Sequence, residues 1–299
     1  GVAISDSGDI TGHFTQVEPL FRRDGGHGMV FRALDGQLYL TLHSPNEHLK
    51  EHPCFIPLEE IAGRLTPKYT LPDWFAPLQI RLHKMADELT ASLTGWHGSD
   101  ATFRPEDFGL VPSEKATRAI QSAIDKAGEH GGTVRLSGGD YVSGTLILRS
   151  NVRLMVDSGS RLLASTDLAD YPEQIARRLT VQDTNMGMNQ SLIFAEGCEN
   201  ICICGGGELD GQGTRANFPG DETCHGTPGR PFLMRIVDCR NVHVHDITLR
   251  SAACWMQNYL NCDRVLLERV TVRNQTNYNN DGIDIDGCRD VIIRNLSLI

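Results

Sequence analysis

The chain has no apolar run near the length of about 18 residues that a membrane-spanning helix requires. It begins at Gly1 rather than at an initiator Met, and it has no signal peptide. Its 38 Asp and Glu residues outnumber its 28 Lys and Arg residues, which form no cluster. These features argue against a membrane or a nucleic acid as partner, and they predict a piece of a longer protein. An acidic substrate stays possible, because a few local cations can override the net charge of -10.

The cysteines lack the spacing of a disulfide framework, and their number, nine, is odd. Four of them open the same short phrase, in which two polar residues and an apolar segment follow; they are Cys198, Cys239, Cys262 and Cys288. From Cys239 onward the copies are 23 and 26 residues apart, a period typical of solenoids whose repeats bury their apolar faces against each other. We therefore expect a buried ladder of reduced thiols at one corner of stacked coils.

A zinc site is the alternative use of the remaining thiols. Cys202 and Cys204 are close in sequence, and Cys224 is followed by His225. The two-residue gap that usually separates paired zinc ligands is missing. The sequence therefore predicts no metal site and no cofactor.

Residues 1–60 have the pattern of β-strands. Apolar runs at 29–34 and 37–42 flank Asp35-Gly36, a strong hairpin signal, and a further strand is expected at 54–58. These few strands cannot bury both faces, so we expect part of a larger β structure.

Residues 61–100 have the pattern of a linker that contains a helix. Pro72-Asp73 gives a plausible start. The apolar positions recur every three or four residues: Phe75, Leu78, Leu82, Met85, Leu89 and Leu93. Such a stripe favours a docking face over a cofactor site.

Residues 101–299 are predicted to form a second, all-β unit. Ser113 is the expected N-cap of a helix that ends at Gly131. Short strands are expected at 133–136, 144–148, 152–156 and 191–195, separated by Gly, Ser, Asn or Asp. Intervals of about 20 to 26 residues fit coils of three strands, that is, a parallel β-helix. The helix would cover the open end of the first coil.

The segment NNDGID at 279–284 concentrates amides and carboxylates in six residues. Read alone, it is a tight turn that enters a half-buried strand. Strict alternation would turn Asp281 inward with Ile283 and Ile285. We therefore expect the strand to begin after Gly282, which leaves Asp281 in the turn.

From about residue 102 to 299, an ordered series of motifs resembles glycoside hydrolase family 28, the polygalacturonases and related pectin hydrolases. The motifs are DFG at 107–109, AIQSAID at 119–125, GGTV at 131–134, YVSGTL at 141–146, SNV at 150–152, GGGELDGQG at 205–213, Arg230-Pro231, Trp255 and NNDGID at 279–284. The resemblance implies a right-handed parallel β-helix, a pectin or galacturonan substrate, and a secreted or periplasmic location.

The resemblance also implies roles for single residues. Asp281 matches the aspartate of the family's Asn-Thr-Asp motif, with Asn280 in place of threonine, and would activate water for an inverting displacement. Asn279 and Asp284 would line the same cleft, and Asn258 stands where many relatives have histidine. Asp210 is interpreted as a turn residue.

Three further family elements, which follow the NNDGID segment in that family, are absent between Asp284 and Ile299: an Asp-Asp pair, a Gly-His-Gly and an Arg-x-Lys that binds the substrate carboxylate. The resemblance therefore implies that these 299 residues lack the general acid and are inactive alone. Two alternatives stay open, a non-catalytic carbohydrate-binding or adhesive β-helix and a pectate lyase. The sequence shows neither the calcium-binding carboxylates nor the arginine base that a lyase requires.

Residues 12–46 resemble the C-terminal end of family 43 glycoside hydrolases, five-bladed β-propellers that act on arabinose- and xylose-containing polysaccharides. The carrying segments are EPLF at 18–21, GGHGM at 25–29 and LHSPN at 42–46. His27 matches a histidine near the propeller centre, although a histidine in a Gly-rich turn is an equal reading. The combined hypothesis is a partial propeller, a helical linker and the front of a β-helix.

Overall fold

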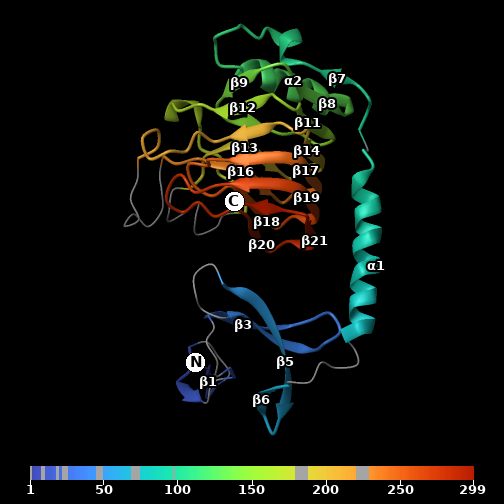
Figure 1. Ribbon diagram of the computed structural model, residues 1–299, viewed down its shortest axis with the longest axis vertical. Coiled ribbons are helices and arrows are strands. Elements are labelled where there is room, and N and C mark those ends of the chain that lie inside the picture. The colour runs from blue at the N-terminus through green and yellow to red at the C-terminus, as the bar shows by residue number, and fades with distance from the viewer. Residues whose placement is uncertain are drawn as a thin grey trace. The chain divides into compact units, whose positions relative to one another are not determined.

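A computed structural model describes residues 2–7, 11–17, 20–21, 26–44, 50–68, 75–96, 98–178, 188–219 and 229–299. The chain divides into two compact units, Gly1–Arg81 and Leu82–Ile299 (Figure 1). No helix among the described residues is long and apolar enough to cross a membrane.

The first unit is built from antiparallel strands. β1 (Val2–Ser5) pairs with β2 (Phe14–Val17), and a four-stranded meander consists of β3 (Gly26–Arg32), β4 (Leu38–Ser44), β5 (His52–Ile61) and β6 (Arg64–Pro67). The predicted hairpin is confirmed: Gly36 has φ 87° and its N–H donates to the carbonyl oxygen of Ala33 at 2.9 Å. The sheet continues past residue 60, through β6. Four strands of this kind do not by themselves show a propeller.

Helix α1 spans Phe75–Thr94, so the boundary between the two units lies within it. In the second unit a short strand β7 (Thr102–Phe103) and the 3-10 helix η1 (Pro105–Phe108) lead to α2 (Thr117–His130). The predicted start of α1 at Pro72-Asp73 lies outside the described residues. The predicted N-cap of α2 is wrong: Ala116 holds that position, while Ser113 is exposed with φ 72°. Gly131, with φ 80°, follows the end of α2 as expected.

The apolar face of α2 covers the first coil. Ile120, Ala123 and Ile124 are fully buried in the same cluster as Val134 of the first coil strand. Helix α2 therefore covers the end of the coiled sheet, where unpaired strand edges would otherwise be exposed, and turns its polar face outward.

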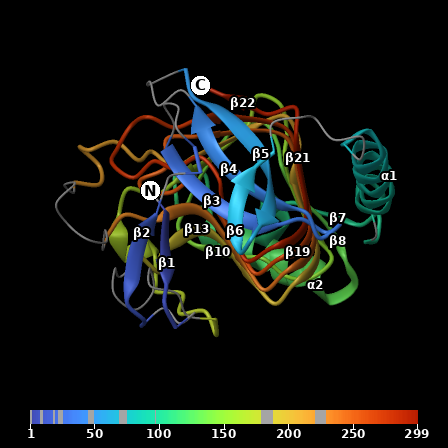
Figure 2. The same ribbon diagram turned by 90° about the horizontal axis from the view of Figure 1, so that it is seen from below.

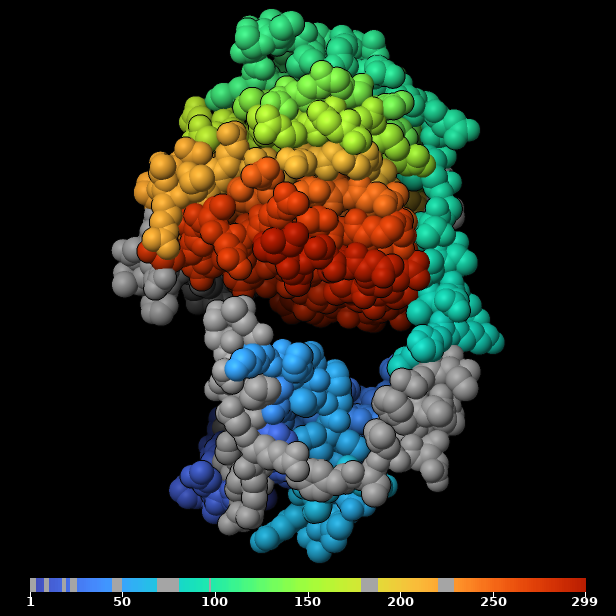
Figure 3. Space-filling model, in the orientation of Figure 1, coloured from blue at the N-terminus to red at the C-terminus, as the bar shows by residue number. Residues whose placement is uncertain are grey.

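The rest of the unit is a stack of coils, seen from below in Figure 2 and as successive layers of colour in Figure 3. Every strand of the stack pairs in parallel with the next coil. One sheet contains β10 (Leu146–Ile147), β13 (Ser191–Glu196), β16 (Phe232–Val237), β18 (Gln257–Leu260) and β20 (Asp284–Asp286). The other contains β8 (Gly132–Leu136), β9 (Asp140–Ser143), β11 (Val152–Val156), β12 (Arg161–Ala164), β14 (Glu199–Cys204), β15 (Glu208–Asp210), β17 (Arg240–Arg250), β19 (Asp263–Arg273), β21 (Arg289–Arg294) and β22 (Ser297–Leu298). The predicted parallel β coils are confirmed, and the unit is mostly β rather than all-β because it contains α2.

Alternation of side chains explains how these short strands make one core. In β11, Val152, Leu154 and Val156 are fully buried, whereas Arg153 and Met155 point outward. Successive coils repeat this pattern in register, so each apolar layer packs on the next.

Asparagines form a ladder at the start of β11, β14 and β17, where Asn151 precedes β11 and Asn200 and Asn241 are the second residues of β14 and β17. Asn151, Asn200 and Asn241 have φ values of 61°, 57° and 55°, a left-handed conformation that asparagine tolerates better than most residues. The side-chain amide of Asn200 donates to Asn151 Oδ1 at 2.7 Å, and that of Asn241 donates to Asn200 Oδ1 at 2.8 Å. In the next coil, Arg264 Nε donates to Asn241 Oδ1 at 2.8 Å.

The predicted thiol ladder is also present. Cys198, Cys239, Cys262 and Cys288 are free and precede strand residues that pair from coil to coil. The backbone N–H of Cys262 donates to Cys288 Sγ at 3.2 Å.

Candidate active site

The side chain of Asn280 holds the loop between β19 and β20 with four hydrogen bonds. Its Oδ1 accepts from the backbone N–H groups of Thr276 (2.9 Å) and Asn277 (2.6 Å). Its Nδ2 donates to the carbonyl oxygens of Ala252 and Cys254 in the preceding coil, both at 3.0 Å. All the hydrogen-bonding capacity of this amide is used in holding the loop on the coil beneath it.

Asp281 lies in this loop with an exposed side chain, as the sequence predicts. Strand β20 begins at Asp284, so the alternation that would have turned Asp281 inward does not reach it. The carbonyl oxygen of Asp281 accepts from the N–H of Met256 at 2.8 Å. The backbone at this position is therefore fixed while the carboxylate faces solvent.

Asp284 and Asn258 are neighbours on the outward face of one sheet. The register places Arg235 of β16 beside Asn258 of β18, and Asn258 beside Asp284 of β20. Asn258 is buried, with 8 % of its surface exposed. The two predicted site residues thus meet because strands of consecutive coils pair residue by residue.

The environment of Asp284 favours its neutral form. Burial, and secondly the charge of Asp281, raise the pKa of Asp284 to about 7. Its Oδ2 is buried and has no hydrogen-bond partner among the described residues. A carboxyl group in this state can donate a hydrogen bond to an incoming hydroxyl or ether oxygen near neutral pH.

Asn279 is on the same loop and is held from below. Its Oδ1 accepts from Arg230 Nη2 at 3.1 Å, and Arg230 Nη1 donates to the carbonyl oxygen of Tyr278 at 2.6 Å. Arg230 is almost fully buried. The charge of Asp281 thus acts on Asp284, and strand pairing sets Asn258 beside Asp284. Asn279 is held in place by its hydrogen bond with Arg230.

Three contributors to this site were not assigned a role from the sequence. Arg230 and Asn280 position the loop, and Arg215 lies over the ring of Tyr278, 3.9 Å from its centroid. The signals were weak: Arg230 stands beside a proline before an apolar strand, and Asn280 occupies a position where the resembling motif has threonine. Neither pattern reveals a buried partner.

Asp210 was interpreted as a turn residue, but it is the last residue of strand β15, and its side chain holds the turn that follows. Its Oδ1 accepts from the N–H of Gln212 at 2.9 Å, and its Oδ2 lies 3.6 Å from Arg250 Nε. Both oxygens are occupied by the turn and by the neighbouring coil.

Comparison with known proteins identifies the coiled unit. The model of the Glycosyl hydrolases family 28 matches residues 150–298. The chain contains a glycosyl hydrolase family 28 domain. The family 28 domain includes the loop of Asp281 and all strands that position Asn258 and Asp284.

Sequence relatives and solved structures agree with this assignment. A probable polygalacturonase of Vitis vinifera is 26% identical over 205 residues, 64% of this chain and 41% of the relative. A polygalacturonase of Ralstonia solanacearum is 35% identical over 129 residues, 42% of this chain and 24% of the relative. The chain therefore spans less than half the length of either.

Among solved structures, the polygalacturonase from Erwinia carotovora aligns with a TM-score of 0.53 and 25% identity over 66% of this chain and 54% of that chain. The exopolygalacturonase from Thermotoga maritima aligns with a TM-score of 0.58 and 19% identity over 72% of this chain and 56% of that chain, and so supports the fold.

Nothing in these comparisons supports the predicted family 43 fragment. His27 has φ 48°, and its ring centroid lies 5.1 Å from that of His43 on the neighbouring strand. The segment EPLF is only partly within the described residues, and the last two residues of LHSPN lie outside them.

Proposed function

We propose that the family 28 domain belongs to a polygalacturonase-type enzyme that hydrolyses galacturonan glycosidic bonds with inversion. The observation that carries the proposal is the pairing of an exposed carboxylate, Asp281, with a neighbouring carboxyl, Asp284, whose pKa is raised to about 7. Inverting glycosidases divide their chemistry between carboxyl groups in different protonation states. The polygalacturonase names of the relatives supply the substrate class.

In this proposal Asp281 activates the attacking water. Its side chain is open to solvent and its backbone is fixed by the coil beneath, so the carboxylate can hold a water in one orientation. Asn279 and Asn258 bind sugar hydroxyls, because their amides offer both donors and acceptors.

Asp284 contributes a hydrogen bond rather than a charge. Polygalacturonate carries a carboxylate on each sugar, so a second anion beside Asp281 would repel the substrate. A neutral Asp284 avoids that repulsion and can donate to the sugar. Arg215, exposed and lying over the ring of Tyr278 from this loop, is a suitable cation for a substrate carboxylate.

The proton donor for the leaving oxygen is assigned to residues outside these 299, as the family resemblance implies. The 299-residue chain should therefore bind oligogalacturonides weakly and produce no measurable new reducing ends from polygalacturonate. Robust turnover would show that Asp284, or the nearby Asp286, supplies the acid.

The variant Asp281→Asn tests the role of the water-activating residue. In a form of the enzyme that is active, it should remove nearly all hydrolysis and leave the melting temperature unchanged, because an exposed loop side chain contributes little stability. Asp286→Asn is the matched control, an exposed carboxylate at the end of β20. Retained hydrolysis in Asp281→Asn would show that Asp281 is an ordinary turn residue with no role in catalysis.

A further inference from the structure

Two adjacent coils place two cysteines and two histidines together on the outer face of the sheet. The register sets Cys202 of β14 beside His243 of β17, and Ile203 beside Val244. One residue further, Cys204 and His245 occupy the same level. Since alternate residues of a strand share a face, all four side chains project from the same side of the sheet.

Three of these side chains bring their donor atoms to one point. The sulfur atoms of Cys202 and Cys204 and a ring nitrogen of His245 lie within 4.8 Å of one another. Cys202 Sγ is 3.5 Å from His245 Nε2. Tetrahedral zinc, with bonds of about 2.3 Å to sulfur and 2.0 Å to nitrogen, separates such atoms by roughly 3.5 Å.

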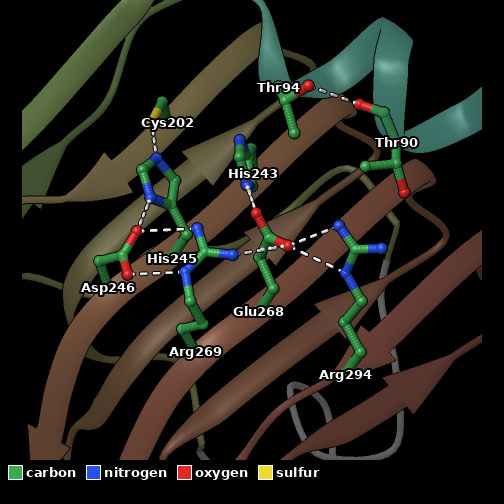
Figure 4. A network of polar contacts seen from close by, with 9 residues as sticks. All are labelled: Thr90, Thr94, Cys202, His243, His245, Asp246, Glu268, Arg269 and Arg294. Carbon is green, nitrogen blue, oxygen red and sulfur yellow. Dashed lines mark hydrogen bonds and ion pairs between the residues drawn. The ribbon is translucent and has the colours of Figure 1, made fainter. Parts of the chain in front are cut away.

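A carboxylate orients the histidine for this purpose (Figure 4). His245 Nδ1 lies 2.7 Å from Asp246 Oδ2, and Arg269 holds the same carboxylate with two hydrogen bonds of 2.7 and 2.8 Å. A carboxylate can only accept, so Nδ1 carries the proton and the Nε2 lone pair points toward Cys202. A histidine whose second nitrogen donates to a carboxylate is the common arrangement among metal ligands.

The fourth side of this cluster is open. A cavity of about 180 Å³ is bounded by all three donor side chains and, opposite them, by Leu93 of α1 and by Trp96. The ladder cysteines, in contrast, are packed into the interior corner. The outward-facing thiols therefore border a space that a bound ion and one further ligand can enter.

We propose that Cys202, Cys204 and His245 form a zinc site with one coordination position open to this cavity. Binding forms two zinc–sulfur bonds and one zinc–nitrogen bond, and the two thiol protons leave to solvent. Two thiolates balance the charge of Zn²⁺, so the buried site is neutral. The proposal differs from the sequence prediction of no metal, which relied on ligand spacing along the chain, whereas the third ligand, His245, comes from the next coil.

A disulfide is the competing use of this pair. Residues two apart on an extended strand have Cα atoms about 6.7 Å apart with nearly parallel Cβ directions, which is at the edge of what a disulfide can bridge. Both cysteines are free in the structure.

The test measures zinc binding by the purified, reduced 299-residue chain, which is first stripped of metal with a chelator, then incubated with excess zinc and desalted. We expect one equivalent of zinc to remain bound, measured by atomic emission. Cobalt added in place of zinc should give thiolate-to-metal charge-transfer absorption. Cys202→Ser, Cys204→Ser and His245→Gln should each lose most of the bound zinc. Asp246→Asn should bind about 10- to 100-fold more weakly, because it no longer orients His245.

Two matched variants separate ligation from general damage. His243→Gln removes the neighbouring imidazole, whose Nε2 is 3.3 Å from Glu268, and Cys54→Ser removes a thiol of the first unit; both should retain zinc. Far-UV circular dichroism checks the fold of each variant. The proposal is overturned if the wild-type chain keeps no zinc, if its cobalt form lacks thiolate absorption, or if folded ligand variants keep a full equivalent.

Discussion

At the scale of single residues, Asp284 links the fold to the protonation state of the site. Its folded-state pKa of about 7 lies well above the value of about 3.9 for an unfolded aspartate. The folded state therefore holds a proton that the unfolded state releases between these values. The free energy of unfolding should fall as pH rises through this window.

The variant Asp284→Asn should remove this dependence. Relative to wild type, its melting temperature should rise by about 2–6 °C between pH 4 and pH 8, which corresponds to ~1–2 kcal/mol after allowance for partial solvent screening. Thermal unfolding at several pH values measures this difference. Asp286→Asn, an exposed carboxylate on the same strand, should show no comparable trend. A constant difference between Asp284→Asn and wild type at all pH values would refute the raised pKa.

The second residue-scale prediction concerns Asn280. Replacement by alanine leaves two backbone N–H groups and two carbonyl oxygens without their partner, and we expect a loss of about 2–4 kcal/mol in the free energy of unfolding. Urea unfolding with an unchanged m-value measures it. Gln275→Ala, an exposed amide on the same loop, should change stability by less than about 0.5 kcal/mol. Equal effects of the two changes would mean that the loop is held by other contacts.

The sequence predicted which residues would be near the site but not how they are held. Asp281 could be placed in a turn because strand alternation made any other position costly. The burial of Asp284 depends on Asn258 in the preceding coil, and that pairing follows from coil lengths of 23 and 26 residues rather than from local pattern. For the same reason the sequence did not indicate that His245 lies close to Cys202, because this proximity depends on the register between consecutive coils.

At the scale of elements, the thiol ladder should show a gradient of reactivity. A hydrogen bond with Cys262 lowers the pKa of Cys288 to about 7, and Cys288 is only half-buried. Cys239 and Cys262 are buried and their pKa values are raised to about 12. Among the ladder cysteines, Cys288 should therefore be alkylated first by iodoacetamide at pH 7.5.

Peptide mapping over a time course measures this order. Cys239 and Cys262 should react only after unfolding in urea. Labelling of Cys239 as fast as Cys288, or a disulfide between any two ladder cysteines, would contradict the described packing.

Helices and strands were predicted correctly where their apolar residues recur with a clear period, but the residues at which they begin and end were predicted poorly. The apolar face of α2 was correct, yet its start was placed at Ser113 because serine is a strong N-cap; in the structure the first turn begins at Thr117 and Ala116 precedes it without a side-chain cap. Capping preference was overridden by the requirement that Ile120 and Ile124 reach the core.

At the scale of the whole molecule, the two units differ in how much apolar surface they bury. Among its described residues, the four-stranded sheet of the first unit has one small cluster of buried residues, Leu40, Leu42 and Leu58, while Met29 and Phe55 are each 62 % exposed. The family 28 domain contains a continuous core along all its coils. The antiparallel pairing of these strands is common to many β structures, so it does not test the predicted propeller, which rests on the segments EPLF, GGHGM and LHSPN.

We expect a fragment of residues 1–68 to unfold without cooperativity and to self-associate, since so small a core cannot offset the loss of chain entropy. A fragment of residues 75–299, which keeps α1 whole, is the control and should unfold cooperatively. Thermal circular dichroism and sedimentation velocity distinguish the two. A monomeric 1–68 fragment with a sharp transition would show that its core is sufficient.

The asparagine ladder gives the molecule a direction. Each amide donates backward, from Asn241 to Asn200 and from Asn200 to Asn151, and Arg264 donates backward to Asn241. A coil that has just been made thus donates at once to the coil already formed before it, and it leaves only an acceptor for the following coil to satisfy. The polarity of these hydrogen bonds coincides with the polarity of translation, so the chain can close coil upon coil as it leaves the ribosome.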